Sequence, residues 1–367
     1  MNALRARAAG LLPILLCLFL ASPGEAQTAP PGVARHVVIV TLDGMRWQEV
    51  FTGADRDYFK RDAQGNAGEP ERRFWRATPA ERRATLMPFL WGTVATEGQI
   101  LGDPAVGSTS RLTNGLWFSY PGYSELFAGV ADPRVDSNRK VPNPNVTVLE
   151  WLNRRPGFEG KVAAFGSWDV LPSILNVDRS GLTVGSGHTL VASPATDRER
   201  AINELASDLP RYWEYGPFDA PVLYAALEHL RMRQPRVLYI LLGETDEWAH
   251  EGRYDLYLDA AFRADRFIER VWATLQGMPE YAGRTALLVT TDHGRGATTT
   301  DWTDHGREVP AAERTWMALL GPGVPARGVR RDVTVTTAQV AATIAALLGE
   351  DFRQGVPAAA PAIDLGR

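Results

Sequence analysis

VVIVTLDG, residues 37–44, is the stretch that decides the fold of this chain. Its first six residues form an unbroken apolar run that is rich in β-branched side chains. Such a run is typical of a strand buried on both faces, as the central strands of parallel sheets are. Asp43 and Gly44 follow at once, which predicts a carboxylate at the carboxyl end of a central strand, where α/β folds bind ligands.

Further apolar runs repeat this pattern along the chain, and amphipathic segments separate them. The other predicted strands are residues 162–165, 237–242, 286–290 and 316–320. The predicted helices are residues 145–153, with Thr147 as cap, 197–209, 221–233 and 256–275. This alternation predicts an α/β fold, a three-layer α/β/α sandwich around a mostly parallel central sheet.

No linker divides the chain, so we expect a single domain over residues 27–367. Residues 51–83 are charged and contain several glycines and prolines, which predicts a loop insertion there. Residues 103–114 and 132–145 are also predicted to be loops, and residues 357–367 a tail.

The first residues, 1–26, have the pattern of a secretory signal peptide. Arg5 and Arg7 precede an apolar run at 11–20, and small residues lead up to Ala26. We therefore predict an exported protein, periplasmic or secreted, with no membrane span in the mature chain; an uncleaved anchor is the alternative. Cys17, the only cysteine, lies within this segment, so a metal in the mature chain must be held by oxygen and imidazole.

The charge of the chain is mildly acidic, with 39 basic and 43 acidic residues and a net charge of -4. Removing the signal peptide leaves 37 and 42, a net charge of -5. Binding to nucleic acid needs a basic surface, so we predict no stable nucleic-acid partner.

Carboxylates and imidazoles follow three of the predicted strands. Asp43 follows the first, and Asp292 with His293 follows the strand that ends in LLVTT. Asp246 and His250 come after a third strand, and their i, i+4 spacing places them on one face of a helical turn. Carboxylate beside neutral imidazole suits a divalent ion of the zinc type, so these segments predict metal ligands.

Each of these segments also has a structural interpretation. Asp43 could cap the helix that follows it, and Asp246 with His250 could form an exposed ion pair, with a nearby glutamate as the ligand instead. His305, in the sequence TDHG, could be a surface histidine. We predict a metal role for His305 because it would complete a site with Asp246 and His250.

Ser119 lies in the aromatic stretch WFSYPGY, just before a helical pattern. An isolated serine is usually structural, but unsatisfied amides at the amino end of a helix favour phosphate oxygens. A hydroxyl that is bound to a metal there becomes a nucleophile. The rings of Trp117, Phe118, Tyr120 and Tyr123 either form an apolar wall for a leaving group or pack in the core.

In this order, the segments resemble those of the alkaline phosphatase superfamily. More narrowly, they resemble its type I phosphodiesterase and nucleotide pyrophosphatase branch, with bacterial phosphohydrolase relatives. The resemblance runs from residue 37 to about residue 320 and implies two divalent metal ions, with Zn²⁺ expected. It assigns one ion to Asp43, Ser119, Asp292 and His293, and the other to Asp246, His250 and His305.

The same resemblance implies a phosphoseryl intermediate on Ser119. It also implies an asparagine that contacts phosphate roughly twenty residues further on, for which Asn138 is the first candidate and Lys140 the second. One departure lies beside the nucleophile, where this chain has Gly122-Tyr123 and the diesterase branch often has Asn-His.

The function that the resemblance implies is an exported two-metal phosphohydrolase of small-molecule phosphate esters, a phosphodiesterase/nucleotide pyrophosphatase or a phosphomonoesterase. A sulfatase is one alternative, since sulfatases share the fold. Their C/S-x-P-x-R signature matches this chain from Ser119 until Tyr123 replaces the arginine. A non-catalytic exported metal-binding protein of the same fold is the other alternative.

Overall fold

The computed structural model of the chain describes residues 33–61 and 63–366. The predicted signal peptide lies outside the described residues and stays a prediction. Within the described part, no helix is both long enough and apolar enough to cross a membrane.

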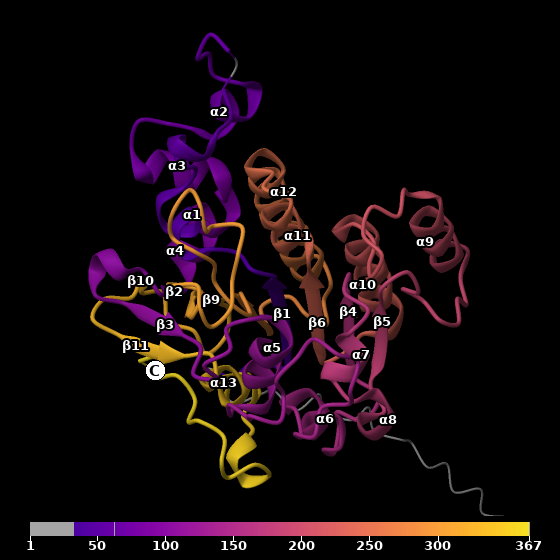
Figure 1. Cartoon of the computed structure of the whole chain (residues 1–367). Helices are drawn as coiled ribbons and strands as arrows, with labels where there is room; N and C mark the ends of the chain where they lie inside the picture. The colour runs from indigo at the N-terminus through magenta and orange to yellow at the C-terminus, as the bar shows by residue number, and fades with distance from the viewer. Residues whose placement is uncertain (1–32, 62, 367) are drawn as a thin grey trace, which may run out of the picture.

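A central sheet of eight strands, in the order β10-β2-β9-β7-β1-β6-β4-β5, forms the middle of the protein (Figure 1). β1 lies between β6 and β7 and runs parallel to both. β9 is antiparallel to its neighbours β2 and β7, and the other seven strands share one direction. The strands are β1 (His36–Leu42), β2 (Gln99–Leu101), β4 (Val162–Gly166), β5 (Thr183–Ser186), β6 (Val237–Leu242), β7 (Thr285–Thr290), β9 (Met317–Leu320) and β10 (Gly328–Val329).

A second, three-stranded sheet lies beside the large one and has the order β11-β3-β8. Its strands are β3 (Thr109–Arg111), β8 (Arg314–Thr315) and β11 (Thr334–Thr336). β3 lies within the predicted loop at residues 103–114, so that prediction is wrong in part. The strand is only three residues long, too short for the alternation that reveals longer strands.

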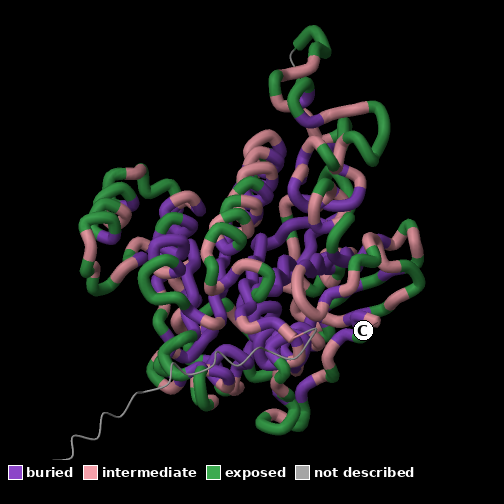
Figure 2. Tube along the Cα trace, turned by 180° about the vertical axis from the view of Figure 1, so that it is seen from behind, coloured by how far each residue is buried: buried purple, intermediate pink, exposed green. Residues whose placement is uncertain are grey.

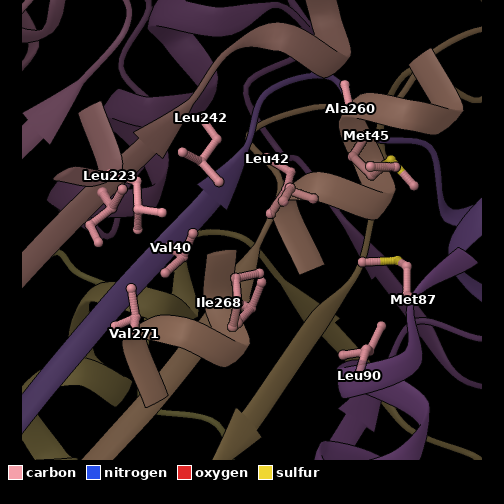
Figure 3. Packing of buried hydrophobic residues seen from close by; sticks show 14 of the residues in the cluster. Val40, Leu42, Met45, Met87, Leu90, Leu223, Leu242, Ala260, Ile268 and Val271 are labelled. Atoms are coloured by element: carbon pink, nitrogen blue, oxygen red, sulfur yellow. The ribbon is translucent and has the colours of Figure 1, made fainter. Parts of the chain in front are cut away.

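Helices cover both faces of the central sheet. Successive side chains of β1 point to opposite faces, and each set is buried against helices on its own side. Val38, Val40 and Leu42 enter one hydrophobic cluster with α1 (Trp47–Thr52), α3 (Pro79–Leu86), α10 (Asp219–Arg233) and α12 (Tyr254–Gln276), and Figure 3 shows Val40 and Leu42 near Ile268 of α12. Val37 enters the other cluster with α5 (Ser119–Ala128), α6 (Val148–Asn153), α7 (Leu171–Ile174) and α13 (Gln339–Leu347). Burying each such side chain stabilises the fold by about 1.5–3 kcal/mol. The predicted α/β/α sandwich with a mostly parallel sheet is confirmed.

The four predicted helices are present as α6, α9, α10 and α12, each within a few residues of its predicted ends, and the other helices of the described structure were not among these four predictions. Thr147 caps α6 as predicted, since its hydroxyl accepts the Glu150 N–H at 3.1 Å. The helices are α1 (Trp47–Thr52), α2 (Glu69–Phe74), α3 (Pro79–Leu86), α4 (Ala95–Glu97), α5 (Ser119–Ala128), α6 (Val148–Asn153), α7 (Leu171–Ile174), α8 (Val177–Ser180), α9 (Asp197–Asp208), α10 (Asp219–Arg233), α11 (Glu244–His250), α12 (Tyr254–Gln276) and α13 (Gln339–Leu347). Short 3-10 or π segments are η1 (Arg56–Tyr58), η2 (Leu90–Val94), η3 (Pro104–Val106) and η4 (Phe352–Gln354).

The predicted loop insertion at residues 51–83 is wrong in part, because this segment contains α2 and most of α3. Thr78 and Glu81 form a reciprocal capping box at the start of α3. Both helices are short and rich in arginine, so they lack the apolar periodicity that predicts a helix. Many side chains of the segment are exposed, as are those of α9 (Figure 2).

The other irregular segments differ in how tightly they are held. Residues 132–145 contain no helix or strand in the described structure, as predicted. The predicted tail at 357–367 is irregular over its described residues, 357–366, but is not loose. Ile363 and Leu365 are buried, and the Gln99 side chain donates to the Leu365 carbonyl at 2.9 Å.

Asp265 of α12 holds the start of η2 against the sheet, and its loss should destabilise the fold. Its two carboxylate oxygens accept the N–H groups of Phe89 and Leu90 at 2.7 and 2.9 Å, and all three groups are buried. Asp265→Ala leaves both donors unpaired, so we expect the free energy of unfolding to fall by about 1–3 kcal/mol. Urea denaturation checks this, with Asp208→Ala, an exposed carboxylate of α9, as the control.

The same variant should change how stability depends on pH. Burial raises the pKa of Asp265 to about 7. The folded protein then binds more protons than the unfolded chain between about pH 4 and 7, so the free energy of unfolding should decrease as pH rises through this range. In Asp265→Ala this decrease should be smaller. An equal decrease in both proteins would contradict the assignment.

Candidate active site

Three neighbouring strands bring the predicted ligands together. β7, β1 and β6 are adjacent and parallel, so their carboxyl ends lie at one edge of the sheet. Asp43 follows β1, Asp292 and His293 follow β7, and α11 follows β6 with Asp246 and His250. The strand order therefore brings residues that are far apart in the sequence together in one site.

The first cluster contains Asp43, Asp292 and His293, all of which are buried. His293 Nε2 lies 3.4 Å from Asp43 Oδ1 and 3.5 Å from Asp292 Oδ2. Among the described residues, neither of these carboxylate oxygens has a hydrogen-bond partner, although both are buried. Unpaired buried anions are costly unless a cation compensates them.

The protonation states of the side chains in the first cluster also favour binding of a cation. His293 Nδ1 lies 2.9 Å from the Gly294 carbonyl, which can only accept, so Nδ1 carries the hydrogen and Nε2 presents its lone pair to the carboxylates. Burial lowers the pKa of His293 to about 4. Burial, and then neighbouring carboxylates, raise the pKa values of Asp43 and Asp292 well above the usual range. A divalent ion at this point would satisfy all three side chains, so the residues fit the metal that was predicted.

The second cluster contains Asp246, His250 and His305. His250 Nε2 lies 3.2 Å from Asp246 Oδ2 and 3.0 Å from His305 Nε2. Burial lowers the pKa of His305 to about 2, so its ring is neutral at physiological pH. Two imidazole nitrogens that converge beside a carboxylate form a typical zinc-type donor set. His305 comes from the loop after β7, so only the fold brings it to α11.

Asp246 connects the two clusters. Its Oδ1 lies 3.8 Å from Nε2 of both His293 and His305. The same oxygen receives a close ion pair from Arg295, which also donates to the Thr303 carbonyl. Burial disfavours the charge of Asp246, but Arg295 and His250 outweigh burial and hold its pKa well below the usual range.

Arg295 was not predicted as a site residue. It is 1% exposed, and an arginine two residues after Asp-His gives no signal of its own. Arg295 follows β7 and Asp246 follows β6, and β1 lies between these two strands in the sheet. The order of residues along the chain does not reveal this strand order, so it does not reveal the pairing of Arg295 with Asp246.

Ser119 is the first residue of α5 and faces the first cluster. Its Oγ lies 3.3 Å from His293 Nε2, and the side chain is 5% exposed. Gly122, one turn further on, explains the departure from Asn-His. A Cβ at this position would lie 2.5 Å from the Asp292 carbonyl oxygen, so only glycine lets α5 approach the loop that carries Asp292 and His293.

Tyr123 supports the first cluster directly, since its buried hydroxyl donates to Asp43 Oδ2 at 2.9 Å. This bond leaves Asp43 Oδ1 to face His293. Removing the partner of a metal ligand typically weakens metal binding about 10–100-fold, and we expect this for Tyr123→Phe. Competition with a chelator measures it. Tyr281→Phe is the control, because that buried hydroxyl bonds to the Pro235 carbonyl, and an equal loss in the control would contradict the role.

A cleft opens over the second cluster and reaches Ser119 and Asp43 of the first cluster. Its lining residues are Asp43, Ser119, Asn138, Ser167, Trp168, Trp213, Tyr215, Gly216, Pro217, Gly243, Glu244, Asp246, Glu247, His250 and His305. Asn138 accepts the Tyr120 N–H at 2.9 Å through Oδ1, so its amide nitrogen stays available as a donor. Lys140 does not line the cleft, and its ammonium group pairs with Asp169 at 2.6 Å.

The aromatic residues of the cleft are not those around Ser119 in the sequence. Trp117, Phe118, Tyr120 and Tyr123 do not line it, and Tyr120 instead donates to the Val141 carbonyl at 2.6 Å. Helix geometry turns successive side chains by about 100°, so Tyr120 of α5 faces away from Ser119, and Trp117 and Phe118 precede the helix. The wall comes instead from Trp168, Trp213 and Tyr215, on segments between elements of the other half of the sheet.

No protein-family model matches the chain, and neither does any curated protein. Solved structures do. The alkaline phosphatase PafA superposes with a TM-score of 0.60 at 12% identity, over 89% of this chain and 97% of its own. The lipoteichoic acid synthase LtaP from Listeria monocytogenes gives 0.55 at 11%, over 88% and 73%. Ps i-CgsB, solved with k-i-k-neocarrahexaose, gives 0.55 at 14%, over 90% and 75%.

A fourth match is described as a member of the alkaline phosphatase superfamily, from Vibrio parahaemolyticus. Its TM-score is 0.52 at 12% identity, over 88% of this chain and 68% of its own. The chain therefore has the fold of the alkaline phosphatase superfamily.

Proposed function

We propose that this chain is an exported two-metal hydrolase of phosphate esters, with Ser119 as its nucleophile. The observation that carries the proposal is the position of Ser119 Oγ, 3.3 Å from His293 Nε2 and in the same cleft as the second cluster. The substrate would be a small-molecule phosphate ester, either a diester or pyrophosphate or a monoester. The superfamily fold and the unpaired carboxylate oxygens of the first cluster support it.

The donor set suits two divalent ions, with Zn²⁺ expected because all the ligands are carboxylate, imidazole or hydroxyl. Asp43, Ser119, Asp292 and His293 would hold one ion, and Asp246, His250 and His305 the other. Ions bound there would activate the serine hydroxyl and offset the charge that develops on phosphate oxygens.

In the proposed reaction, Ser119 Oγ attacks the phosphorus of the ester and loses its proton. The bond between phosphorus and the alcohol oxygen breaks, the alcohol leaves with a proton, and a phosphoseryl intermediate forms. Water then cleaves the bond between phosphorus and Oγ. The Asn138 amide would donate to a phosphate oxygen, and the amino end of α5 favours the same anion.

Metal content and substrate class test the proposal together. The purified chain should contain about two zinc ions and lose activity on treatment with a chelator. Assays with p-nitrophenyl phosphate, bis-p-nitrophenyl phosphate and p-nitrophenyl sulfate should show hydrolysis of a phosphate ester above that of the sulfate. A faster sulfate reaction would favour the sulfatase, and bound metal without any turnover would favour the non-catalytic protein.

A further inference from the structure

One wall of the cleft is aromatic and acidic and takes no part in the proposed metal sites. It consists of Trp168, Trp213, Tyr215 and Glu247, which we call the aromatic–acidic wall. All four side chains line the same cleft as Ser119, Asp43 and the second cluster. A substrate whose phosphorus lies at Ser119 would therefore place an organic group against this wall.

Hydrogen bonds and close packing hold the two segments of the wall together. The Asp169 N–H, next to Trp168, donates to the Tyr215 carbonyl at 3.1 Å. A Cβ at Gly216 would lie 1.9 Å from the Ser167 carbonyl oxygen, so glycine is needed for the segments to pack this closely. The three aromatic residues of the wall thus lie on two neighbouring loops in fixed contact, and Glu247 lies on α11.

The side chains of the wall are oriented as well. The ring centroid of Trp213 lies 4.9 Å from that of Trp248 on α11, and Trp213 is 6% exposed. The Tyr215 hydroxyl donates to Glu247 Oε2 at 3.2 Å. Trp213 and the pair of Tyr215 and Glu247 are therefore set in place before a ligand binds, which lowers the cost of ordering them.

The charge balance of the cleft indicates the kind of group that the wall takes. Among the described residues that line it there is no lysine or arginine. Asp43 and Asp246 belong to the metal clusters, and Glu244 pairs with Arg263 at 2.7 Å. Glu247 is the remaining carboxyl group of the lining and has no ion pair within the described structure, and it accepts a hydrogen bond from the Tyr215 hydroxyl.

A polar atom beside the wall also points to a ligand. Ser167 is 4% exposed and lines the cleft, and its hydroxyl has no hydrogen-bond partner in the described structure. A buried hydroxyl without a partner is unfavourable, and an oxygen of a bound ester would satisfy it.

We propose that the aromatic–acidic wall binds an alkylammonium group, so that the substrate is a phosphate ester of an amino alcohol, such as phosphocholine or phosphoethanolamine. This inference rests on the proposed function. Aromatic rings attract a desolvated cation, and Glu247 presents carboxyl oxygens on the same wall of the cleft. A cleft without lysine or arginine suits a cationic organic group better than a polyphosphate chain.

A pair of isosteric substrates tests the inference. Phosphocholine and 3,3-dimethylbutyl phosphate have the same shape, and only the first carries the ammonium charge. With zinc present, phosphate release should give a kcat/KM at least about tenfold higher for phosphocholine. Isothermal titration calorimetry should likewise show that choline binds more tightly than 3,3-dimethylbutanol. This experiment measures binding to the aromatic–acidic wall without turnover.

Variants then locate the preference. Glu247→Gln and Tyr215→Leu should bring the kcat/KM ratio of the two substrates close to one, whereas Glu251→Gln, an exposed carboxylate outside the cleft, should keep it. Equal rates for both substrates in the unaltered chain, or an unchanged ratio in Glu247→Gln, would overturn this inference alone. No hydrolysis of these esters or of p-nitrophenyl phosphate would overturn the proposed function, and this inference with it.

Discussion

Ser119→Ala should lose kcat by about 10³-fold or more while the protein keeps its metal. Removing a nucleophile eliminates the covalent route, and single losses in such groups cost at least this much. Ser119 is one of four groups proposed for the first ion, and Asp43, Asp292 and His293 remain to bind it. Initial rates on p-nitrophenyl phosphate, together with zinc content by mass spectrometry, measure both properties in one preparation.

Ser124→Ala is the matched control, because Ser124 is a second buried serine on α5 whose hydroxyl accepts the Asn143 amide at 3.1 Å. It should keep its kcat. A Ser119→Ala protein with unchanged kcat would exclude Ser119 as the nucleophile. In that case no phosphoseryl intermediate would form on Ser119. Trapping of labelled phosphate on the unaltered protein at low pH provides the direct check.

His293→Ala should reduce the zinc content from about two ions per chain to about one and remove activity. His293 is fully buried, and its Nε2 faces Asp43, Asp292 and Ser119. Losing this ligand should weaken binding more than the roughly 10–100-fold that follows loss of a ligand's hydrogen-bond partner. Dialysis followed by elemental analysis measures the ions that remain.

His229→Ala controls for the removal of a histidine in the same layered fold. The His229 ring packs at 5.2 Å from the Phe165 ring and belongs to neither cluster. We expect two ions and full activity in this variant. If His293→Ala also kept two ions, the first cluster would not be a metal site. A different cation would then have to compensate the buried carboxylates of Asp43 and Asp292.

The sequence was sufficient to predict the main strands and to name candidate metal ligands at their ends. Val37 to Leu42 predicts a buried parallel strand because a strand covered on both faces must be apolar at every position. The same logic predicts β6 and β7, and the polar residues after each strand then fall at one edge of the sheet. Asp43, Asp292 and His293 could be named on this ground alone.

Tertiary structure decided the residues that surround those ligands. Tyr123 holds Asp43 by a bond across 80 positions, and Arg295 holds Asp246 across 49. Neither pairing follows from local spacing, because two segments meet only when a particular strand order places them side by side. The short helices α2 and α3 were missed for a related reason, since packing stabilises them more than their own periodicity does.

By itself, the sequence determined the α/β class, the central strand and the carboxylates and imidazoles at the strand ends, since these follow from local burial and period. Only the tertiary structure decided that Ser119 faces His293, that His305 joins α11, and that Trp168, Trp213 and Tyr215 form the wall of the cleft. Those contacts join loops that are distant in the chain, and their geometry is set by how the sheet and its helices pack.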